Sequence, residues 1–365
     1  SQARNLAQRA TEILEQALGP EHPSTGASIG NLAAIHLRMH DIFGSAESLF
    51  QRALEITERA LGPEHPANVT ILNDFAYFYI DDRKFDAAEP LLQRAVEITE
   101  RALGPEHPKT ASSIYYLARF FQDSGKWTDA AEPLLRRALE INETAFGPGH
   151  RETQRRLEKL VALLEYRGDL NGAEQVLRRA LESNKHVLEP GLNSSIVGYN
   201  RAAQYLAGFL EDRGDLDEAE CILQEAIELN VAEHSSPHYC LLASELSSNL
   251  ADLLKDRGNM DEAERFYRKS VEMCENQMGL EYTDVEEHVE KLTRFLHDRG
   301  DLDGAERAFG KVLDSLEPSL GSEDERNHCG DKYCTIAEQF IHFLHESGDF
   351  EKAERFLRKA HAIFE

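Results

Sequence analysis

Four histidines of the chain stand in nearly the same short phrase, and three of them follow a glutamate. The phrase Leu-Gly-Pro-Glu-His-Pro begins at Leu18, Leu61 and Leu103, and a shortened copy, Phe-Gly-Pro-Gly-His, begins at Phe146. Imidazole and carboxylate groups are common in proton transfer and in zinc binding. The phrase therefore raises two chemical hypotheses, acid–base catalysis and a shared metal site.

The spacing of the copies argues against a shared metal site. They begin 43, 42 and 43 residues apart, so each copy falls in a separate structural unit. Stacked helices lie about 8–10 Å apart, whereas zinc needs its nitrogen ligands at about 2.1 Å. His22, His65, His107 and His150 therefore cannot converge on one ion. The Gly-Pro before each histidine is instead typical of a link, in which glycine supplies the left-handed residue after one helix and Pro66 opens the next.

Other residues that could do chemistry lack a motif around them. His328, Cys329 and Cys334 could bind a metal, but their spacing matches no zinc module. There is no glycine-rich phosphate loop and no Gly-x-Ser-x-Gly sequence. We predict no enzymatic activity, no metal site and no cofactor. A metal-dependent enzyme at residues 328–334 is the least favoured alternative.

Composition and charge narrow the class of partner. The 365 residues are 41% hydrophobic, carry a net charge of −26 and contain no apolar run long enough to span a membrane. Residues 1–200 contribute −6 and residues 201–365 contribute −20. Such a surface repels phosphate backbones and anionic lipids, which argues against nucleic-acid or membrane partners. Five scattered cysteines and the lack of a signal-peptide pattern favour a cytoplasmic location.

A second repeated phrase defines the architecture. Ala-Glu recurs with steps of 42, 43, 42, 46, 44, 42 and 48 residues, beginning at Ala46, Ala88, Ala131, Ala173, Ala219, Ala263, Ala305 and Ala353. A period of this size indicates a solenoid in which each unit buries its apolar face against its neighbours. Because each period contains two amphipathic stretches, we predict an all-α, right-handed superhelical solenoid: a lone helix at about residues 2–17, then eight antiparallel helix hairpins.

The apolar positions predict how the hairpins pack. Large apolar residues stand four residues after each of these alanines: Phe50, Leu92, Leu135, Leu177, Leu223, Tyr267, Phe309 and Leu357. Small residues recur about twelve residues before most of the alanines and seven after them, as Ala76 and Ala95 do. Large side chains that face small ones allow stacked helices to interdigitate.

This pattern resembles the tetratricopeptide repeat, and the unit of about 42 residues with its LGPEHP link looks like the kinesin light chain type. That type also recurs as the sensor region of bacterial and fungal signal-transduction ATPases. The resemblance covers the whole chain and is strongest in residues 1–182, where the link survives. We predict an N-terminal array (1–182), a linker (183–198) and a C-terminal array (199–365) that carries a long acidic loop (316–332).

The resemblance implies where a ligand would bind, since the first helix of each tetratricopeptide hairpin lines a concave groove. The residues expected there are Ser28, Asn31, Ile35, Thr70, Asn73, Tyr77, Ser112, Tyr115, Arg119, Arg155 and Arg201. Asn31 and Asn73 match a position that kinesin light chain repeats use on cargo peptides. An amide can both donate to and accept from a peptide backbone, and Tyr77, Tyr115 and Arg119 suit a side-chain pocket.

The C-terminal half of the expected groove is acidic and would favour a basic ligand, because it carries Glu245, Asp252, Glu287, Glu290 and Glu338. We therefore predict a non-catalytic scaffold that binds a peptide or protein segment in the groove. The main alternative is a ligand-sensing region of a larger signalling protein, such as a switch ATPase or a protease. Self-association, groove to loop, is a further alternative.

Overall fold

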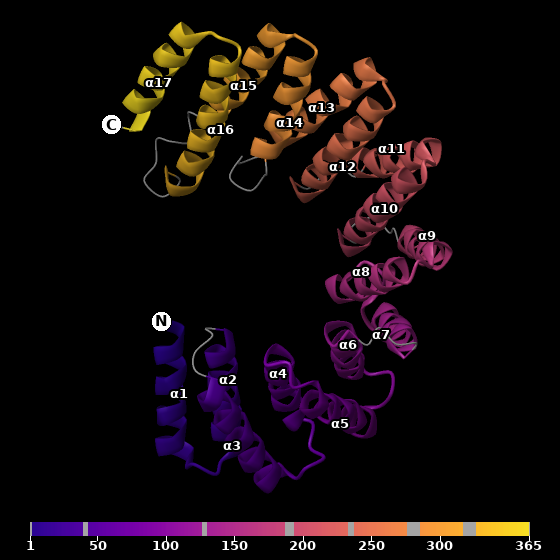
Figure 1. The fold of residues 1–365 in the computed structure, drawn as a ribbon, viewed down its shortest axis with the longest axis vertical. Helices are drawn as coiled ribbons and strands as arrows, with labels where there is room; N and C mark the ends of the chain where they lie inside the picture. Colours follow the sequence, from indigo (N-terminus) through magenta and orange to yellow (C-terminus); the bar gives the residue numbers. More distant parts are fainter. Residues whose placement is uncertain are drawn as a thin grey trace. The chain divides into compact units, whose positions relative to one another are not determined.

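The computed structural model describes residues 2–38, 43–125, 130–186, 193–232, 237–275, 285–316 and 326–364. These ranges hold seventeen helices and no strand (Figure 1), which confirms the all-α prediction. The helices are α1 (Gln2–Leu18), α2 (Pro23–Arg38), α3 (Phe43–Leu61), α4 (Asn68–Asp81), α5 (Phe85–Leu103), α6 (Pro108–Asp123), α7 (Ala131–Phe146), α8 (Arg151–Tyr166), α9 (Leu170–His186), α10 (Asn193–Arg213), α11 (Leu216–Ala232), α12 (Pro237–Asp256), α13 (Met260–Glu275), α14 (Val285–Asp298), α15 (Leu302–Leu316), α16 (Arg326–Glu346) and α17 (Phe350–Phe364). Within the described ranges, no helix has the length and apolar character that a bilayer crossing requires.

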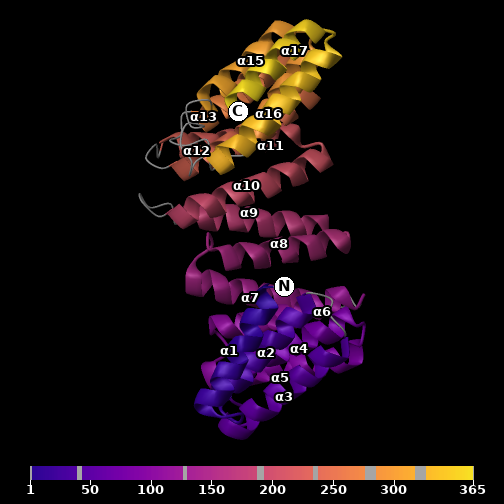
Figure 2. The same ribbon diagram turned by 90° about the vertical axis from the view of Figure 1, so that its left-hand side faces the viewer.

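Contacts divide the chain into two compact units, unit 1 (Ser1–Leu177) and unit 2 (Arg178–Glu365). After α1, the helices form hairpins whose first members, the A helices, are α2, α4 and so on to α16, and whose second members are the B helices. Neighbouring A helices contact one another, α2–α4–α6 in unit 1 and α10–α12–α14–α16 in unit 2. Figure 2 shows α2 beside α4 in unit 1. The segment predicted to be a linker, 183–198, is helical at both ends. Residues 183–186 lie in α9, and residues 193–198 lie in α10. Helix α15 ends at Leu316, and α16 begins at Arg326 within the segment 316–332.

The core follows the predicted alternation of large and small side chains. Phe50 and Leu92 are 0% and 1% exposed, and Ala53 and Ala95 are fully buried. The ring of Phe50 stacks on that of Phe75 with centroids 5.4 Å apart. Burying one such large side chain stabilises the fold by about 1.5–3 kcal/mol. The last position of the series is an exception, because Leu357 on α17 is 48% exposed.

The turns inside the hairpins use one backbone conformation. Gly168 has a φ of 74°, and the next residue, Asp169, accepts a hydrogen bond at Oδ1 from the N–H of Gly172 at 3.0 Å. The residue after the turn glycine therefore caps the B helix. In the second hairpin Arg83 takes the turn position with a φ of 56°. There α5 begins at Phe85 with Lys84 as its N-cap residue, and Asp86 lies in the first turn instead of capping the helix.

Candidate functional site

The four link histidines bond to the backbone near the start of an A helix, and His107 and His150 are the N-caps of α6 and α8. In each case Nδ1 accepts a hydrogen bond from the backbone N–H two residues further on: His22 from Ser24 at 3.1 Å, His65 from Ala67 at 3.2 Å, His107 from Lys109 at 3.1 Å and His150 from Glu152 at 3.2 Å. The first N–H groups of a helix have no partner within the helix, and a side-chain acceptor stabilises them. A nitrogen used in this way is not available to a metal or to a substrate proton.

The link glycine adopts a conformation that only glycine tolerates well. Gly104 closes α5 with φ 99° and ψ 157°, and its N–H donates to the carbonyl of Glu100. The positive φ was expected, but the ψ lies outside the left-handed helical region, in a region almost restricted to glycine. The carbonyl of Gly104 accepts a hydrogen bond from Thr110 Oγ1 at 2.8 Å. The link is therefore a fixed structure rather than a loose connection.

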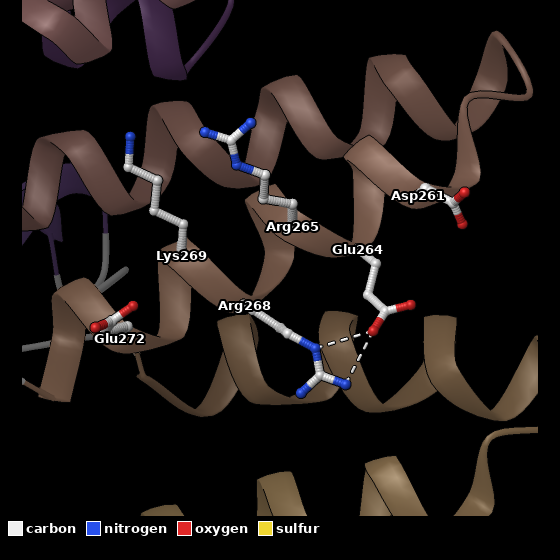
Figure 3. A pocket seen from close by; sticks show the side chains of 6 residues that line it. All are labelled: Asp261, Glu264, Arg265, Arg268, Lys269 and Glu272. Carbon is white, nitrogen blue, oxygen red and sulfur yellow. Dashed lines mark hydrogen bonds and ion pairs between the residues drawn. The ribbon is translucent and has the colours of Figure 1, made fainter.

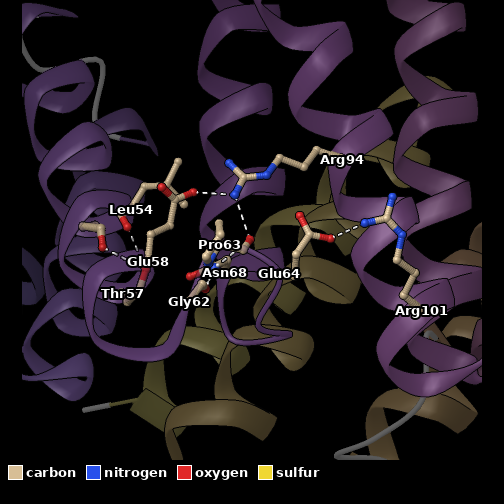
Figure 4. A network of polar contacts seen from close by, with 10 residues as sticks. Leu54, Thr57, Glu58, Gly62, Pro63, Glu64, Asn68, Arg94 and Arg101 are labelled. Carbon is tan, nitrogen blue, oxygen red and sulfur yellow. Dashed lines mark hydrogen bonds and ion pairs between the residues drawn. The ribbon is translucent and has the colours of Figure 1, made fainter.

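In the first two links the glutamate of the phrase ties the link to the following hairpin. In the second link Glu64 forms an ion pair with Arg101 at 2.5 Å, and Arg94 donates to the Pro63 carbonyl at 2.7 Å (Figure 4). Arg94 also pairs with Glu58 at 2.6 Å. Both arginines come from α5, the B helix of the next hairpin. Since the fold uses the glycine, glutamate and histidine of the phrase, we look for a binding site on other residues.

The predicted residues on the first two A helices differ in accessibility. Asn31 on α2 and Thr70 on α4 are exposed, and Ile35 on α2 is half-buried. The Ser28 hydroxyl forms a hydrogen bond with Thr11 Oγ1 of α1 at 2.9 Å. Asn31 and Thr70 can therefore meet a ligand, whereas Ser28 takes part in the packing of α1 on α2.

Tyr77 and Arg119 connect two neighbouring A helices. The Arg119 guanidinium carbon lies 5.4 Å from the centroid of the Tyr77 ring, between α6 and α4. Tyr77 is 40% exposed, and Arg119 has one further contact, with Asp123 at 3.5 Å. A cation–π contact at an exposed site contributes about 0.5–1 kcal/mol. The pair forms a small aromatic and cationic patch on the A-helix face of unit 1.

An arginine that is not among the predicted site residues, Arg156, packs against the ring of Tyr115. Arg156 of α8 is 3% exposed, lies 4.3 Å from the Tyr115 ring centroid and pairs with Glu152 at 2.5 Å. Its Nη2 is 3.5 Å from Ser112 Oγ. The arginine predicted to line the groove, Arg155, is exposed and lies 3.6 Å from Glu152. Arg156 therefore joins α8 to the predicted residues Ser112 and Tyr115 of α6.

Asn73 occupies an unusual position on this face. It is 8% exposed, and its Oδ1 has no hydrogen-bond partner among the described residues. A buried polar atom without a partner costs about 1–3 kcal/mol. The oxygen itself is shielded from solvent, so a donor such as a peptide N–H would remove this cost once the Asn73 side chain turns outward.

Unit 2 contains a cavity at the last predicted residue, Arg201. It measures about 430 Å³ and lies between two A helices, lined by Val197, Arg201, Gln204 and Tyr205 of α10 and by Leu242, Glu245 and Asn249 of α12. Tyr205 is 42% exposed. The mixture of amides, charges and an exposed ring can bind a polypeptide segment. Asn249 and Tyr205 were not among the predicted site residues, because only the packing of α10 on α12 brings them to this cavity.

A second surface cavity of about 570 Å³ lies along the B helix α13 (Figure 3). Glu264 forms ion pairs there with Arg268 at 3.0 Å and with Arg299 at 2.9 Å. Arg265 and Lys269 point together away from this ion pair in Figure 3. Burial and the neighbouring Arg265 lower the pKa of Lys269. All six lining residues come from one helix, so we do not regard this surface as the candidate site.

Metal-ligating residues do not gather in the described part of the chain. No group of three or more His, Cys, Asp or Glu side chains there could hold an ion. Of the residues at 328–334, Cys334 is an exposed cysteine, and the side chains of His328 and Cys329 lie outside the described residues.

The repeats match known family models. One model of the tetratricopeptide repeat matches residues 68–132 and 199–276, and another matches residues 25–67 and 153–191. The chain belongs to the tetratricopeptide repeat family. The family matches confirm the tetratricopeptide resemblance that the two repeated phrases predicted. Tetratricopeptide repeats generally mediate protein–protein interaction and do not themselves catalyse reactions. Among proteins with curated descriptions, none matches this tetratricopeptide chain.

Several solved structures are similar to the chain. A kinesin light chain-type repeat protein from Podosopora anserina is 22% identical, with a TM-score of 0.45, and the match covers 59% of this chain and 99% of that one. BtubC from P. vanneervenii is 22% identical, with a TM-score of 0.49, over 64% of this chain and 91% of that one. A signal-transduction ATPase with a tetratricopeptide sensor from Pyrococcus horikoshii is 15% identical, with a TM-score of 0.45, over 98% of this chain and 52% of that one.

Proposed function

We propose that the chain is a non-catalytic interaction module of the cytoplasm that binds an extended polypeptide segment along its A helices. The observation that carries this proposal is Asn73, whose buried amide oxygen has no partner within the described residues. An extended peptide offers backbone N–H groups at regular intervals, and one of them would satisfy this oxygen.

The neighbouring side chains support the same function. Asn31 is exposed on α2, and Tyr77 is 40% exposed on α4 beside Arg119. Aromatic and arginine side chains contribute most of the binding energy in many protein interfaces. In unit 2, Gln204 and Tyr205 line the cavity between α10 and α12. Each unit therefore has its own candidate surface for a polypeptide.

The proposal can be tested with displayed peptides. Random dodecapeptides on phage are selected against the wild-type chain, and the dissociation constants of the selected synthetic peptides are measured by fluorescence polarisation. We expect Asn31→Ala/Tyr77→Ala or Gln204→Ala/Tyr205→Ala to weaken binding at least tenfold, which is about 1.4 kcal/mol.

The matched control is a double variant on exposed B-helix positions, Glu55→Ala/Gln93→Ala, which should bind like the wild type. Circular dichroism confirms that every variant is folded. The proposal is refuted if the selected peptides bind all variants with equal affinity, or if only the B-helix control variant lowers their affinity. Either result would place the binding surface away from the A helices. A sensor region within a larger signalling protein and self-association stay predictions from the sequence.

A further inference from the structure

A second cavity adjoins the one at Arg201 in unit 2. It measures about 170 Å³ and is lined by Gln204, Ala207, Gly208 and Glu211 of α10, by Asn249, Asp252, Leu253 and Asp256 of α12, and by Leu223 of α11. Gln204 and Asn249 line both cavities. The two cavities therefore form one groove along α10 and α12, with amide side chains at the point where they meet.

Open space lies beside Gly208 in the second cavity. An added Cβ at Gly208 would meet no atom within 4 Å. The cavity volume is several times the roughly 30 Å³ that a water molecule occupies in the liquid. The head group of a long side chain can enter such a space.

Three carboxylates give this end of the groove its charge. Asp252 is already neutralised, since Lys291 lies 3.1 Å away and the Tyr267 hydroxyl donates to its other oxygen. No ion pair is found for Glu211 or Asp256 among the described residues. Two negative charges thus remain at the cavity without a cation.

The electrostatic state of Glu211 agrees with an uncompensated charge. Burial raises the pKa of its carboxyl above the usual range, and the nearby Asp256, Asp212 and Asp252 raise it further. An ionised group held in this way costs folding stability. Binding sites often retain such groups because the ligand supplies the missing charge.

A buried hydroxyl lies on the same part of α12. Ser248 is 1% exposed, and its Oγ has no partner among the described residues. It stands three residues after Glu245 and four before Asp252, so it shares a helix face with the residues that line the groove. Ser248 lines neither cavity, so the charge and the amides of the lining residues alone make the groove a candidate site.

We propose, on the basis of the proposed function, that the α10–α12 groove binds a polypeptide segment through a basic side chain. The peptide backbone meets the amides of Gln204 and Asn249, and the cationic head group lies between Glu211 and Asp256. Arginine fits best, because its guanidinium can donate to two carboxylates at once. Lysine would bind more weakly, as a point charge.

The test uses a single capped arginine in place of a whole peptide. Nα-acetyl-arginine amide is titrated into the ²H,¹⁵N-labelled full chain at constant ionic strength, and the Gly208 amide signal is followed by NMR. We expect a saturable shift. Nα-acetyl-citrulline amide, which has the same shape without the charge, should bind about tenfold more weakly or not at all.

Matched variants connect the shift to the two carboxylates. Glu211→Gln/Asp256→Asn should abolish the arginine-induced shift, whereas Glu262→Gln/Glu286→Gln, which removes the same charge from α13 and α14, should preserve it. Equal responses to arginine and citrulline, no saturable shift, or an unchanged shift in the groove variant would each overturn the inference.

This experiment separates the inference from the proposed function. If displayed peptides bind the A helices but Gly208 does not respond to arginine, the basic-side-chain site is wrong and the interaction module stands. If Gly208 responds but no peptide depends on the A-helix residues, the arginine site stands and the interaction module is wrong.

Discussion

Replacing Arg156 tests whether a buried arginine holds α6 and α8 together. Its stacking on Tyr115 at 4.3 Å, almost fully desolvated, contributes about 2 kcal/mol. The ion pair with Glu152 adds about 1 kcal/mol at most, because that carboxylate is 35% exposed and water screens it. Arg156→Ala should therefore lower the free energy of unfolding by about 3 kcal/mol. For a unit of this size the melting temperature should fall by roughly 6–12 °C.

The adjacent Arg155 provides the control. It contacts the same carboxylate of Glu152, at 3.6 Å, but its side chain is 53% exposed. Arg155→Ala should change the stability by no more than about 0.5 kcal/mol. Arg156→Lys keeps the charge but loses the planar stacking, so its stability should be intermediate. Thermal melts by circular dichroism, with hydrogen exchange of α6 and α8, measure these effects. If the two alanine variants behave alike, the buried stacking does not stabilise this interface.

Three further predictions concern single positions. His107→Ala should lower the free energy of unfolding, measured in urea, by about 1 kcal/mol. His107→Asn keeps an acceptor for the N–H of Lys109 and should recover most of this loss. Equal losses in the two variants would contradict the capping role of His107. Because the pKa of Glu211 is raised above 4.5 in the folded state, its ionised form costs stability above that pKa. Glu211→Gln should therefore raise the melting temperature at pH 7. This advantage should shrink as the pH falls through the raised pKa and be absent once the pH reaches the ordinary carboxyl range; a gain independent of pH would contradict the assignment. Asn200 and Asn230 exchange two hydrogen bonds of 2.9 Å in the core. Asn200→Leu should therefore lower the free energy of unfolding in urea by about 1–3 kcal/mol, and Asn200→Leu/Asn230→Leu should lower it less. Additive losses in the double variant would contradict the pairing.

The sequence predicted the hairpins correctly because repetition states the same local signals many times. Ala-Glu marks each B helix, and the large residue four positions later is buried in every hairpin described except the last. Glycine at a turn and an aspartate after it have direct local effects on the backbone, as at Gly168 and Asp169. Such features do not depend on which helix lies opposite, so they can be predicted without the tertiary structure.

The details of the candidate site depend on neighbouring helices and could not be predicted in this way. Arg155 and Arg156 are consecutive, yet only the packing of α8 on Tyr115 decides which of them is buried. The role of His107 was left open because imidazole is an uncommon helix cap. The groove at Gly208 arises where α10 and α12 meet, and spacing along one helix cannot reveal it.

The one-way bonding of the links has a consequence for how genes for such chains change in length. Arg59 contacts Glu21 and Arg101 contacts Glu64, so α3 and α5 each bind the link that precedes their own hairpin. Excision of residues 62–103 would join Leu61 to Gly104 and regenerate the phrase LGPEHP without a scar. Unequal exchange between copies could therefore add or remove one hairpin at a time and leave the remaining junctions intact. Each such event would change the binding face by one A helix, so the length of a recognised ligand could evolve in discrete steps.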